Sequence, residues 1–142
     1  MATSDAERIR VLLADDHRLV ADSIALLLQQ EFKVLGIAHD GRAMVRMARQ
    51  FKPDVIVCDI TMPHLNGIDA TRLLAADFPD SNILILTMHE DVSLAQEAFR
   101  AGAKGFLLKV SATQELLSAV KIVAKGDRYI TPALSHILSS GV

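Results

Sequence analysis

The segment Asp54-Val55-Ile56-Val57-Cys58-Asp59 decides the fold, because it is a short apolar run that ends in a carboxylate. Its apolar residues follow one another without polar interruptions, which is typical of a parallel strand that is buried on both faces. In open α/β sheets, ligands bind and reactions occur at the carboxyl ends of the strands. We therefore expect Asp59 to lie in a functional site.

A second apolar run, Ile9-Arg10-Val11-Leu12-Leu13-Ala14, ends in the adjacent pair Asp15 and Asp16. Two parallel strands would thus bring three carboxylates to one edge of a sheet. These groups would repel one another unless a divalent cation kept them ionised, and an all-oxygen site with room for water suits Mg²⁺. The alternative is that Asp15 or Asp16 caps a helix that begins near His17.

Short β-rich runs alternate with longer helical patterns along the chain, which predicts a parallel sheet with helices on both faces. Strands are expected at 9–14, 33–38, 54–58, 82–87 and 105–108. Helices are expected at 18–30, 41–51, 66–77, 92–101 and 112–125. With 142 residues, the chain is predicted to form one domain. After Gly126 the pattern changes: residues 129–132 look extended, 133–138 could start a short helix, and 139–142 resemble a linker.

The composition excludes several classes of protein. It combines 51% hydrophobic with 23% charged residues and a net charge of −2, so it offers polyanions no bulk attraction and argues against direct nucleic-acid binding. No apolar stretch approaches the roughly 18 residues of a membrane span, and the N-terminus lacks the features of a signal peptide. The single Cys58 cannot form an internal disulfide. We expect a cytoplasmic protein without membrane contact.

Two further strand ends carry groups that would complement the carboxylates. Thr87 closes the run 83–87, and Lys109 follows Phe106-Leu107-Leu108. A hydroxyl donor and a compact positive charge at the same edge predict an anion site. Taken singly, each has a plainer interpretation, because Thr favours strands and a Lys at a strand end usually reaches solvent.

The histidines and the cysteine carry less information. The histidines form no close ligand pair on a helical face, so no transition-metal site is predicted, and His17 is expected beside the acidic pocket without acting as a ligand. Strand alternation should turn Cys58 away from Asp59 into the core. The five histidines are His17, His39, His64, His89 and His136.

These residues together resemble the receiver domain of bacterial two-component response regulators. The resemblance rests on Asp15-Asp16, on Asp59-Ile60-Thr61-Met62-Pro63-His64-Leu65-Asn66-Gly67, on Thr87 and on Lys109, and it spans residues 8–127. It implies a flavodoxin-like (βα)5 fold, doubly wound around a five-stranded parallel sheet in the order 2-1-3-4-5.

Three stretches are similar, more particularly, to the NarL/FixJ subfamily. They are Leu86-Thr87-Met88-His89, Gly102-Ala103-Lys104-Gly105-Phe106-Leu107-Leu108-Lys109 and Gly126-Asp127-Arg128-Tyr129-Ile130. Members of that subfamily usually carry a C-terminal helix-turn-helix DNA-binding domain. The resemblance thus implies that residues 128–142 begin a linker to an output domain that is absent from this chain, and that DNA is contacted only through that domain.

The resemblance also implies roles for the acidic residues. Asp59 would accept a phosphoryl group from the phosphohistidine of a sensor histidine kinase. Asp16 and Asp59 would bind Mg²⁺ directly, Asp15 directly or through water, and the backbone carbonyl of Thr61 would complete the protein ligands.

Further roles concern the phosphoryl group and the switch. Thr87 and Lys109 would bind the phosphoryl group, Thr87 and Phe106 would form the switch, and Thr61 and His89 would tune the lifetime of the phosphate. Phe106 would move inward, and the signal would emerge on the face between the fourth and fifth helices. Without the resemblance, Phe106 reads as an ordinary core ring.

The function implied is a phosphorylation switch with weak phosphotransfer and autophosphatase activity, not a classical enzyme. It would form a phosphorylation-dependent homodimer, through the first and fifth helices or through the fourth helix and fifth strand. Alternatives are a stand-alone regulator that acts by protein contact and an aspartyl-phosphate Mg²⁺ phosphohydrolase, although Thr61 stands where the latter would have a second Asp. A flavin or nucleotide module is disfavoured, because Asp15 and Asp16 would repel its phosphate.

Overall fold

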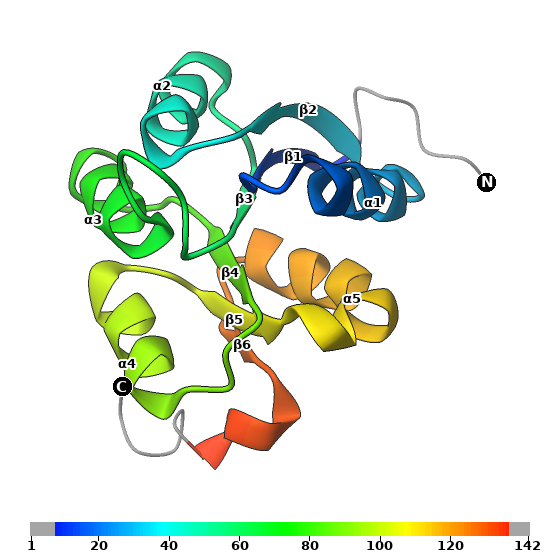
Figure 1. The fold of residues 1–142 in the computed structure, drawn as a ribbon, viewed down its shortest axis with the longest axis vertical. Coiled ribbons are helices and arrows are strands. Elements are labelled where there is room, and N and C mark those ends of the chain that lie inside the picture. Colours follow the sequence, from blue (N-terminus) through cyan, green and yellow to red (C-terminus); the bar gives the residue numbers. More distant parts are fainter. Residues whose placement is uncertain (1–7, 137–142) are drawn as a thin grey trace.

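The computed structural model describes residues 8–136, which form one α/β unit around a parallel sheet (Figure 1). Its strands lie in the order β2-β1-β3-β4-β5-β6 and all neighbours pair in parallel. The strands are β1 (Arg10–Ala14), β2 (Lys33–Ala38), β3 (Val55–Cys58), β4 (Ile83–Thr87), β5 (Gly105–Leu108) and β6 (Tyr129–Ile130). No helix among these residues is long and apolar enough to cross a lipid bilayer.

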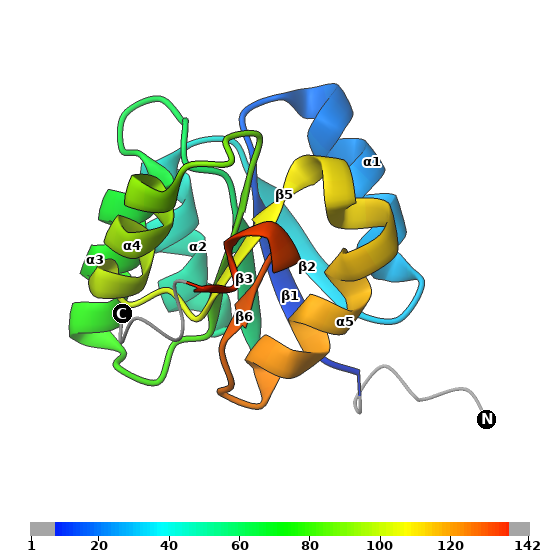
Figure 2. The same cartoon turned by 90° about the horizontal axis from the view of Figure 1, so that it is seen from below.

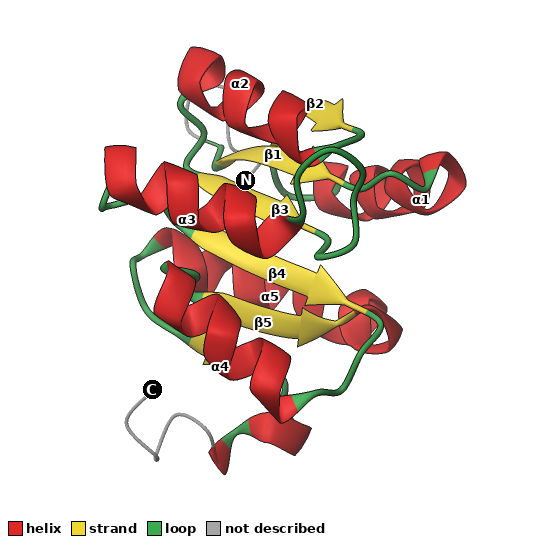
Figure 3. Cartoon of the chain, turned by 60° about the vertical axis from the view of Figure 1, so that its left-hand side comes forward, coloured by secondary structure: helices red, strands yellow, loops and turns green. Residues whose placement is uncertain are grey.

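Five α-helices cover the two faces of the sheet (Figure 2). α1 and α5 lie on one face, and α2, α3 and α4 lie on the other. The helices are α1 (Arg18–Gln29), α2 (Gly41–Phe51), α3 (Gly67–Asp77), α4 (Val92–Ala101) and α5 (Ala112–Ala124). The predicted doubly wound architecture is therefore confirmed, with each of the helices predicted between residues 18 and 125 present (Figure 3).

The core shows why the central strands are unbroken apolar runs. In β3, Val55 and Val57 pack in the layer under α1 and α5, whereas Ile56 and Cys58 pack in the layer under α2 to α4. Both faces of the strand are thus removed from water, so every position must be apolar. Asp59 directly follows Cys58, the last residue of β3, and therefore lies at the carboxyl edge of the sheet.

The predicted five-stranded sheet is wrong by one strand. Tyr129 and Ile130 pair with Gly105 and Phe106, and this adds β6 to the outer edge of β5. Two residues are too few to produce a recognisable period, but they satisfy backbone groups that an edge strand otherwise leaves open. The strand ends at Ile130, Pro132–Leu134 form a 3₁₀ turn at the start of the segment 133–138 where a short helix was expected, and His136 is helical. Residues 137 and 138 of that expected helix lie outside the described range.

Candidate functional site

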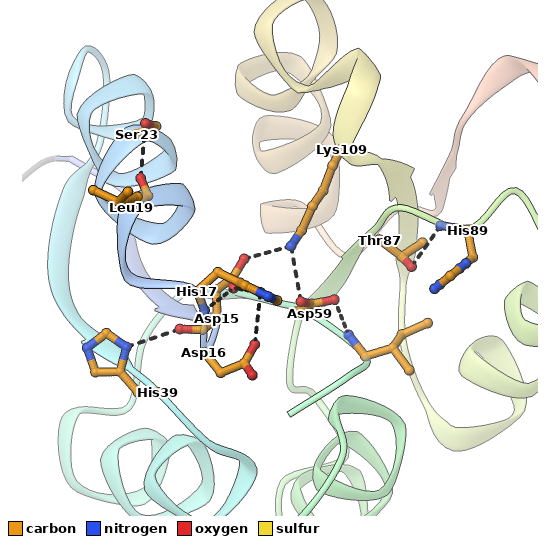
Figure 4. Close-up of polar contacts among 11 residues, drawn as sticks. Asp15, Asp16, His17, Leu19, Ser23, His39, Asp59, Thr87, His89 and Lys109 are labelled. Carbon is orange, nitrogen blue, oxygen red and sulfur yellow. Dashed lines mark hydrogen bonds and ion pairs between the residues drawn. The ribbon is translucent and has the colours of Figure 1, made fainter. Parts of the chain in front are cut away.

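Asp15, Asp16 and Asp59 meet at the carboxyl edge of the sheet (Figure 4). β1 and β3 are neighbours in register, and the backbone N–H of Asp59 donates a 2.9 Å hydrogen bond to the carbonyl oxygen of Ala14. One carboxylate oxygen from each Asp and one ring nitrogen of His17 all lie within 4.8 Å of one another. The convergence expected of the three carboxylates is present, and His17 adds a nitrogen that was not expected among the ligand atoms.

Lys109 joins two of these carboxylates. Its Nζ donates to Oδ2 of Asp15 at 2.8 Å and to Oδ2 of Asp59 at 3.0 Å. Burial by itself lowers the pKa of Lys109, but the hydrogen bonds and negative charges of Asp15 and Asp59 outweigh it, and the pKa is raised above its ordinary value. Lys109 is therefore a permanent cation at neutral pH, and it offsets part of the repulsion between two nearly buried carboxylates.

The remaining carboxylate oxygens differ in how they are satisfied. Oδ1 of Asp15 accepts from the backbone N–H of His17 at 2.9 Å, and Oδ1 of Asp59 accepts from that of Ile60 at 2.8 Å. Oδ1 of Asp16 is buried and accepts no hydrogen bond, although Nδ1 of His17 lies 3.2 Å from it. Buried polar atoms are rarely left without a partner, so an unsatisfied oxygen among carboxylates fits a hard divalent cation such as Mg²⁺.

The capping alternative for Asp15 and Asp16 is wrong. The N-cap residue of α1 is His17, in an extended conformation, and no side chain caps this helix end. Neither Asp is the N-cap residue, although Oδ1 of Asp15 accepts a 2.9 Å hydrogen bond from the backbone N–H of His17. Their convergence needs another explanation, which a cation site provides.

Thr87 and Phe106 lie on the adjacent strands β4 and β5. The Thr87 hydroxyl, which is buried, accepts a 3.2 Å hydrogen bond from the backbone N–H of His89. Phe106 is fully buried in the layer under α2 to α4. The side chains of Thr61 and His89 are exposed on the loops that follow β3 and β4.

Gly67 supports the site in a way that its residue type alone did not reveal. A Cβ atom at this position would lie 1.9 Å from the carbonyl oxygen of Asp59, and the backbone N–H of Gly67 donates to Ile60 at 2.8 Å. The start of α3 therefore packs directly on the backbone that carries Asp59. His39 was also missed as a neighbour: its Nδ1 lies 3.1 Å from the backbone oxygen of Asp15. The sequence signal for the contact between Gly67 and Asp59 was the glycine itself, which stands eight residues after the carboxylate at the end of β3.

Cys58 is a core residue, as expected. Its side chain is fully buried, and burial raises the pKa of its thiol to about 12, with a smaller opposing contribution from Thr71 and a smaller supporting one from Asp59. A thiol in this environment is not a nucleophile at neutral pH.

Comparison with known proteins identifies the family. The sequence profile of the response regulator receiver domain matches residues 11–121. The transcriptional regulatory protein DegU of Brevibacillus brevis is 38% identical over 133 residues, which cover 92% of this chain and 56% of DegU. The oxygen regulatory protein NreC of Staphylococcus carnosus is 37% identical over 133 residues, covering 92% of this chain and 61% of NreC. The chain thus spans less than two thirds of the length of these relatives.

Solved structures agree. A LuxR-family two-component response regulator from Aurantimonas sp. SI85-9A1 superposes with a TM-score of 0.88 and 32% identity, covering 94% of this chain and 97% of the other. The NarL signal receiver domain from Mycobacterium tuberculosis superposes with a TM-score of 0.80 and 32% identity, covering 84% of this chain and 98% of the NarL domain. RcsB, in a structure of two RcsB dimers bound to two parallel DNAs, superposes with a TM-score of 0.82 and 25% identity, covering 94% of this chain and 69% of the RcsB chain. The chain therefore belongs to the response regulator receiver domains, and among them to the NarL/FixJ type.

Proposed function

We propose that Asp59 accepts a phosphoryl group from the phosphohistidine of a sensor histidine kinase and that the resulting acyl phosphate is the signal. Receiver domains are signalling switches rather than classical enzymes. The observation that supports this role for Asp59 most directly is its contact with Lys109, whose Nζ lies 3.0 Å from Oδ2. In the transfer, a carboxylate oxygen of Asp59 bonds to phosphorus while the bond between phosphorus and the kinase histidine breaks. Lys109 offsets the added negative charge.

The acidic residues would hold Mg²⁺ for this transfer. Asp16 and Asp59 bind it directly, Asp15 directly or through water, and the backbone carbonyl of Thr61 completes the protein ligands. The unsatisfied Oδ1 of Asp16 supports this assignment. When bound, the cation neutralises phosphoryl oxygens and orients them for in-line displacement.

Thr87, Lys109 and Phe106 would convert phosphorylation into a change of surface. The Thr87 hydroxyl turns toward the phosphoryl group and gives up its 3.2 Å hydrogen bond from His89, which is long and therefore weak. Phe106 is already fully buried, so we propose that Thr87 holds the ring inward instead of drawing it in from solvent. The exposed Thr61 and His89 flank the site and tune how fast water removes the phosphate, which gives the chain a weak autophosphatase activity.

The partners are proposed from the family. We propose that residues 8–127 are the receiver and that 128–142 begin the connection to a helix-turn-helix output domain, with Tyr129 and Ile130 anchored as β6. DNA is bound through that output domain alone, as a dimer, and the protein acts in the cytoplasm. The net charge of −2 gives the receiver itself no attraction for DNA.

Of the two homodimer surfaces expected, we propose the one on α1 and α5. Large apolar side chains are exposed on or next to these helices: in α1, Leu19 is 84% exposed and Leu26 is 68% exposed, and Val110, in the turn before α5, is 88% exposed. A groove between α1 and the start of α5 includes both Leu19 and Lys109, so this surface adjoins the phosphorylation site. The outer edge of β5 is instead covered by β6, which leaves less of the alternative surface free.

Incubation with Mg²⁺ and acetyl phosphate, followed by intact mass spectrometry, tests the proposal. We expect one phosphoryl adduct in the native protein and none in Asp59→Asn, with both proteins folded by circular dichroism. A folded native protein that binds Mg²⁺ and gains no adduct would overturn the proposal. An adduct that persists in Asp59→Asn would show that another residue is the acceptor.

A further inference from the structure

We infer that His17 is a ligand of the cation at the acidic edge and strengthens the preference of this site for transition-metal divalent cations such as Co²⁺ or Ni²⁺ over Mg²⁺. The inference rests on the proposed function, because it concerns the same cation site, and it adds to the selectivity that three carboxylates alone would have. It also departs from the expectation, drawn from histidine spacing, that His17 is no ligand.

The distances around His17 are those of neighbouring ligands. Its Nδ1 lies 3.2 Å from Oδ1 of Asp16 and 3.6 Å from Oδ1 of Asp15. Bonds of about 2.1 Å to an octahedral ion place adjacent ligand atoms about 3 Å apart. The imidazole nitrogen thus already lies where a ligand next to Asp16 belongs, and no large side-chain movement is needed.

An ordinary ion pair explains this contact less well. Oδ1 of Asp16 is buried and has no hydrogen-bond partner, so the His17 ring nitrogen 3.2 Å away does not satisfy it. The His17 side chain is 66% exposed, and ion pairs of exposed groups contribute only about 0–1 kcal/mol. A cation between the two atoms satisfies the lone pairs of both.

The backbone holds His17 in this position. It is the N-cap residue of α1, and its backbone N–H donates a 2.9 Å hydrogen bond to Oδ1 of Asp15. This hydrogen bond fixes the backbone of His17, and so its imidazole lies beside the carboxylates. His39 lies at the same edge but directs its Nδ1 to the backbone oxygen of Asp15, and it does not belong to the group of converging ligand atoms.

The donor set decides the selectivity. Carboxylate and carbonyl oxygens suit Mg²⁺, whereas an imidazole nitrogen suits transition metals and adds little to Mg²⁺ affinity. A site of three carboxylates and one imidazole therefore follows the order of transition-metal affinities more steeply than an all-oxygen site. His17 is the residue that makes this difference.

Isothermal titration of tag-free protein with MgCl₂ and, separately, with NiCl₂ tests the inference in the native chain, His17→Ala and the matched control His39→Ala. We expect His17→Ala to weaken Ni²⁺ binding by roughly tenfold or more, the order seen when support of a metal site is removed, and to change Mg²⁺ binding by less than about threefold. His39→Ala should leave both affinities near native values. Because His17 is exposed, its removal leaves the core intact.

Pulsed electron paramagnetic resonance of the Mn²⁺-loaded protein provides a direct readout of the ligand. Modulation from a ¹⁴N nucleus should be present in the native chain and in His39→Ala, and absent in His17→Ala. Equal losses of Ni²⁺ and Mg²⁺ affinity, or ¹⁴N modulation that survives His17→Ala, would overturn the role of His17 while leaving the phosphorylation switch in place. Failure of the native protein to bind either cation would overturn both.

Discussion

The backbone N–H of Thr131 donates a 2.9 Å hydrogen bond to the carbonyl oxygen of Phe106, and the preceding residue, Ile130, lies opposite Phe106 in the sheet. The short strand β6 is thereby tied to the aromatic residue that we propose as part of the switch. A shift of the Phe106 backbone would therefore move β6 and Thr131, where the chain leaves the receiver.

Thr131→Pro should remove this hydrogen bond with little other disturbance. The φ of Thr131 is −51°, which proline adopts, and Ile130 is already in a strand, as a residue before proline prefers. The loss leaves a buried carbonyl unsatisfied, so we expect the free energy of unfolding in urea to fall by about 1–3 kcal/mol. Thr131→Val keeps the N–H and is the control. Equal stabilities of the two variants would contradict the assigned importance of the bond.

Lys109→Met should destabilise the metal-free protein. It leaves the carboxylates of Asp15 and Asp59 without their shared cation, and we expect a loss of about 1–3 kcal/mol in urea unfolding with EDTA. Mg²⁺ should restore part of the loss, because it supplies positive charge to the same oxygens. Lys104→Met is the control, because Lys104 donates a hydrogen bond to the neutral side chain of Asn82. It should lower the free energy of unfolding by less, and Mg²⁺ should not change that loss. A loss in Lys109→Met that Mg²⁺ leaves unchanged would argue against a shared site.

Tyr129 should make the fold sensitive to alkaline pH. Burial, and then the hydrogen bond to Glu115 and its negative charge, raise the pKa of Tyr129 above its ordinary value. The folded state thus keeps a proton that the unfolded state loses above about pH 10, so stability is full below that pH and falls as pH rises further. Lys109 contributes in the same direction. Urea unfolding between pH 8 and 11 should show a smaller decline in Tyr129→Phe than in the native protein; identical declines would refute the assignment.

Cys58 should be inert to thiol reagents in the native state. It is fully buried, and the pKa of its thiol is about 12, so the reactive thiolate is scarce and inaccessible at pH 8. We expect no reaction with 5,5′-dithiobis(2-nitrobenzoate) in buffer and one equivalent in denaturant. Rapid reaction of the folded protein would mean that the layer under α3 opens readily.

Gly67→Ala should disturb the phosphorylation site through the backbone. The added methyl would meet the carbonyl oxygen of Asp59 at 1.9 Å, so either α3 or the end of β3 must shift. We expect a strong loss of phosphoryl adduct formation with acetyl phosphate, together with lower stability. In the control Gly36→Ala, the methyl meets only the flexible end of Met47, at 2.9 Å, and adduct formation should persist. Equal adduct yields in both variants would contradict the close approach.

Local sequence determined much of the fold because buried strands are short unbroken apolar runs and amphipathic helices have a helical period, and both patterns can be read directly. The third strand was expected at 54–58 and is Val55–Cys58, and the fifth helix was expected at 112–125 and is Ala112–Ala124. β6 was missed as a strand because two residues have no period; its stability comes from hydrogen bonds to β5, which lies over twenty residues earlier in the chain.

The sequence by itself also determined which residue types stand at the strand ends. It therefore predicted that carboxylates gather at one edge of the sheet and that Lys109 lies near them. Only the tertiary structure decided their pairing. The ammonium of Lys109 reaches Asp15 across 94 residues of sequence, Oδ1 of Asp16 is left without a hydrogen bond, and His17 lies beside it. The physical reason is that strand ends are defined by local hydrophobic pattern, whereas side-chain contacts depend on strand order, register and the angle at which each loop leaves the sheet.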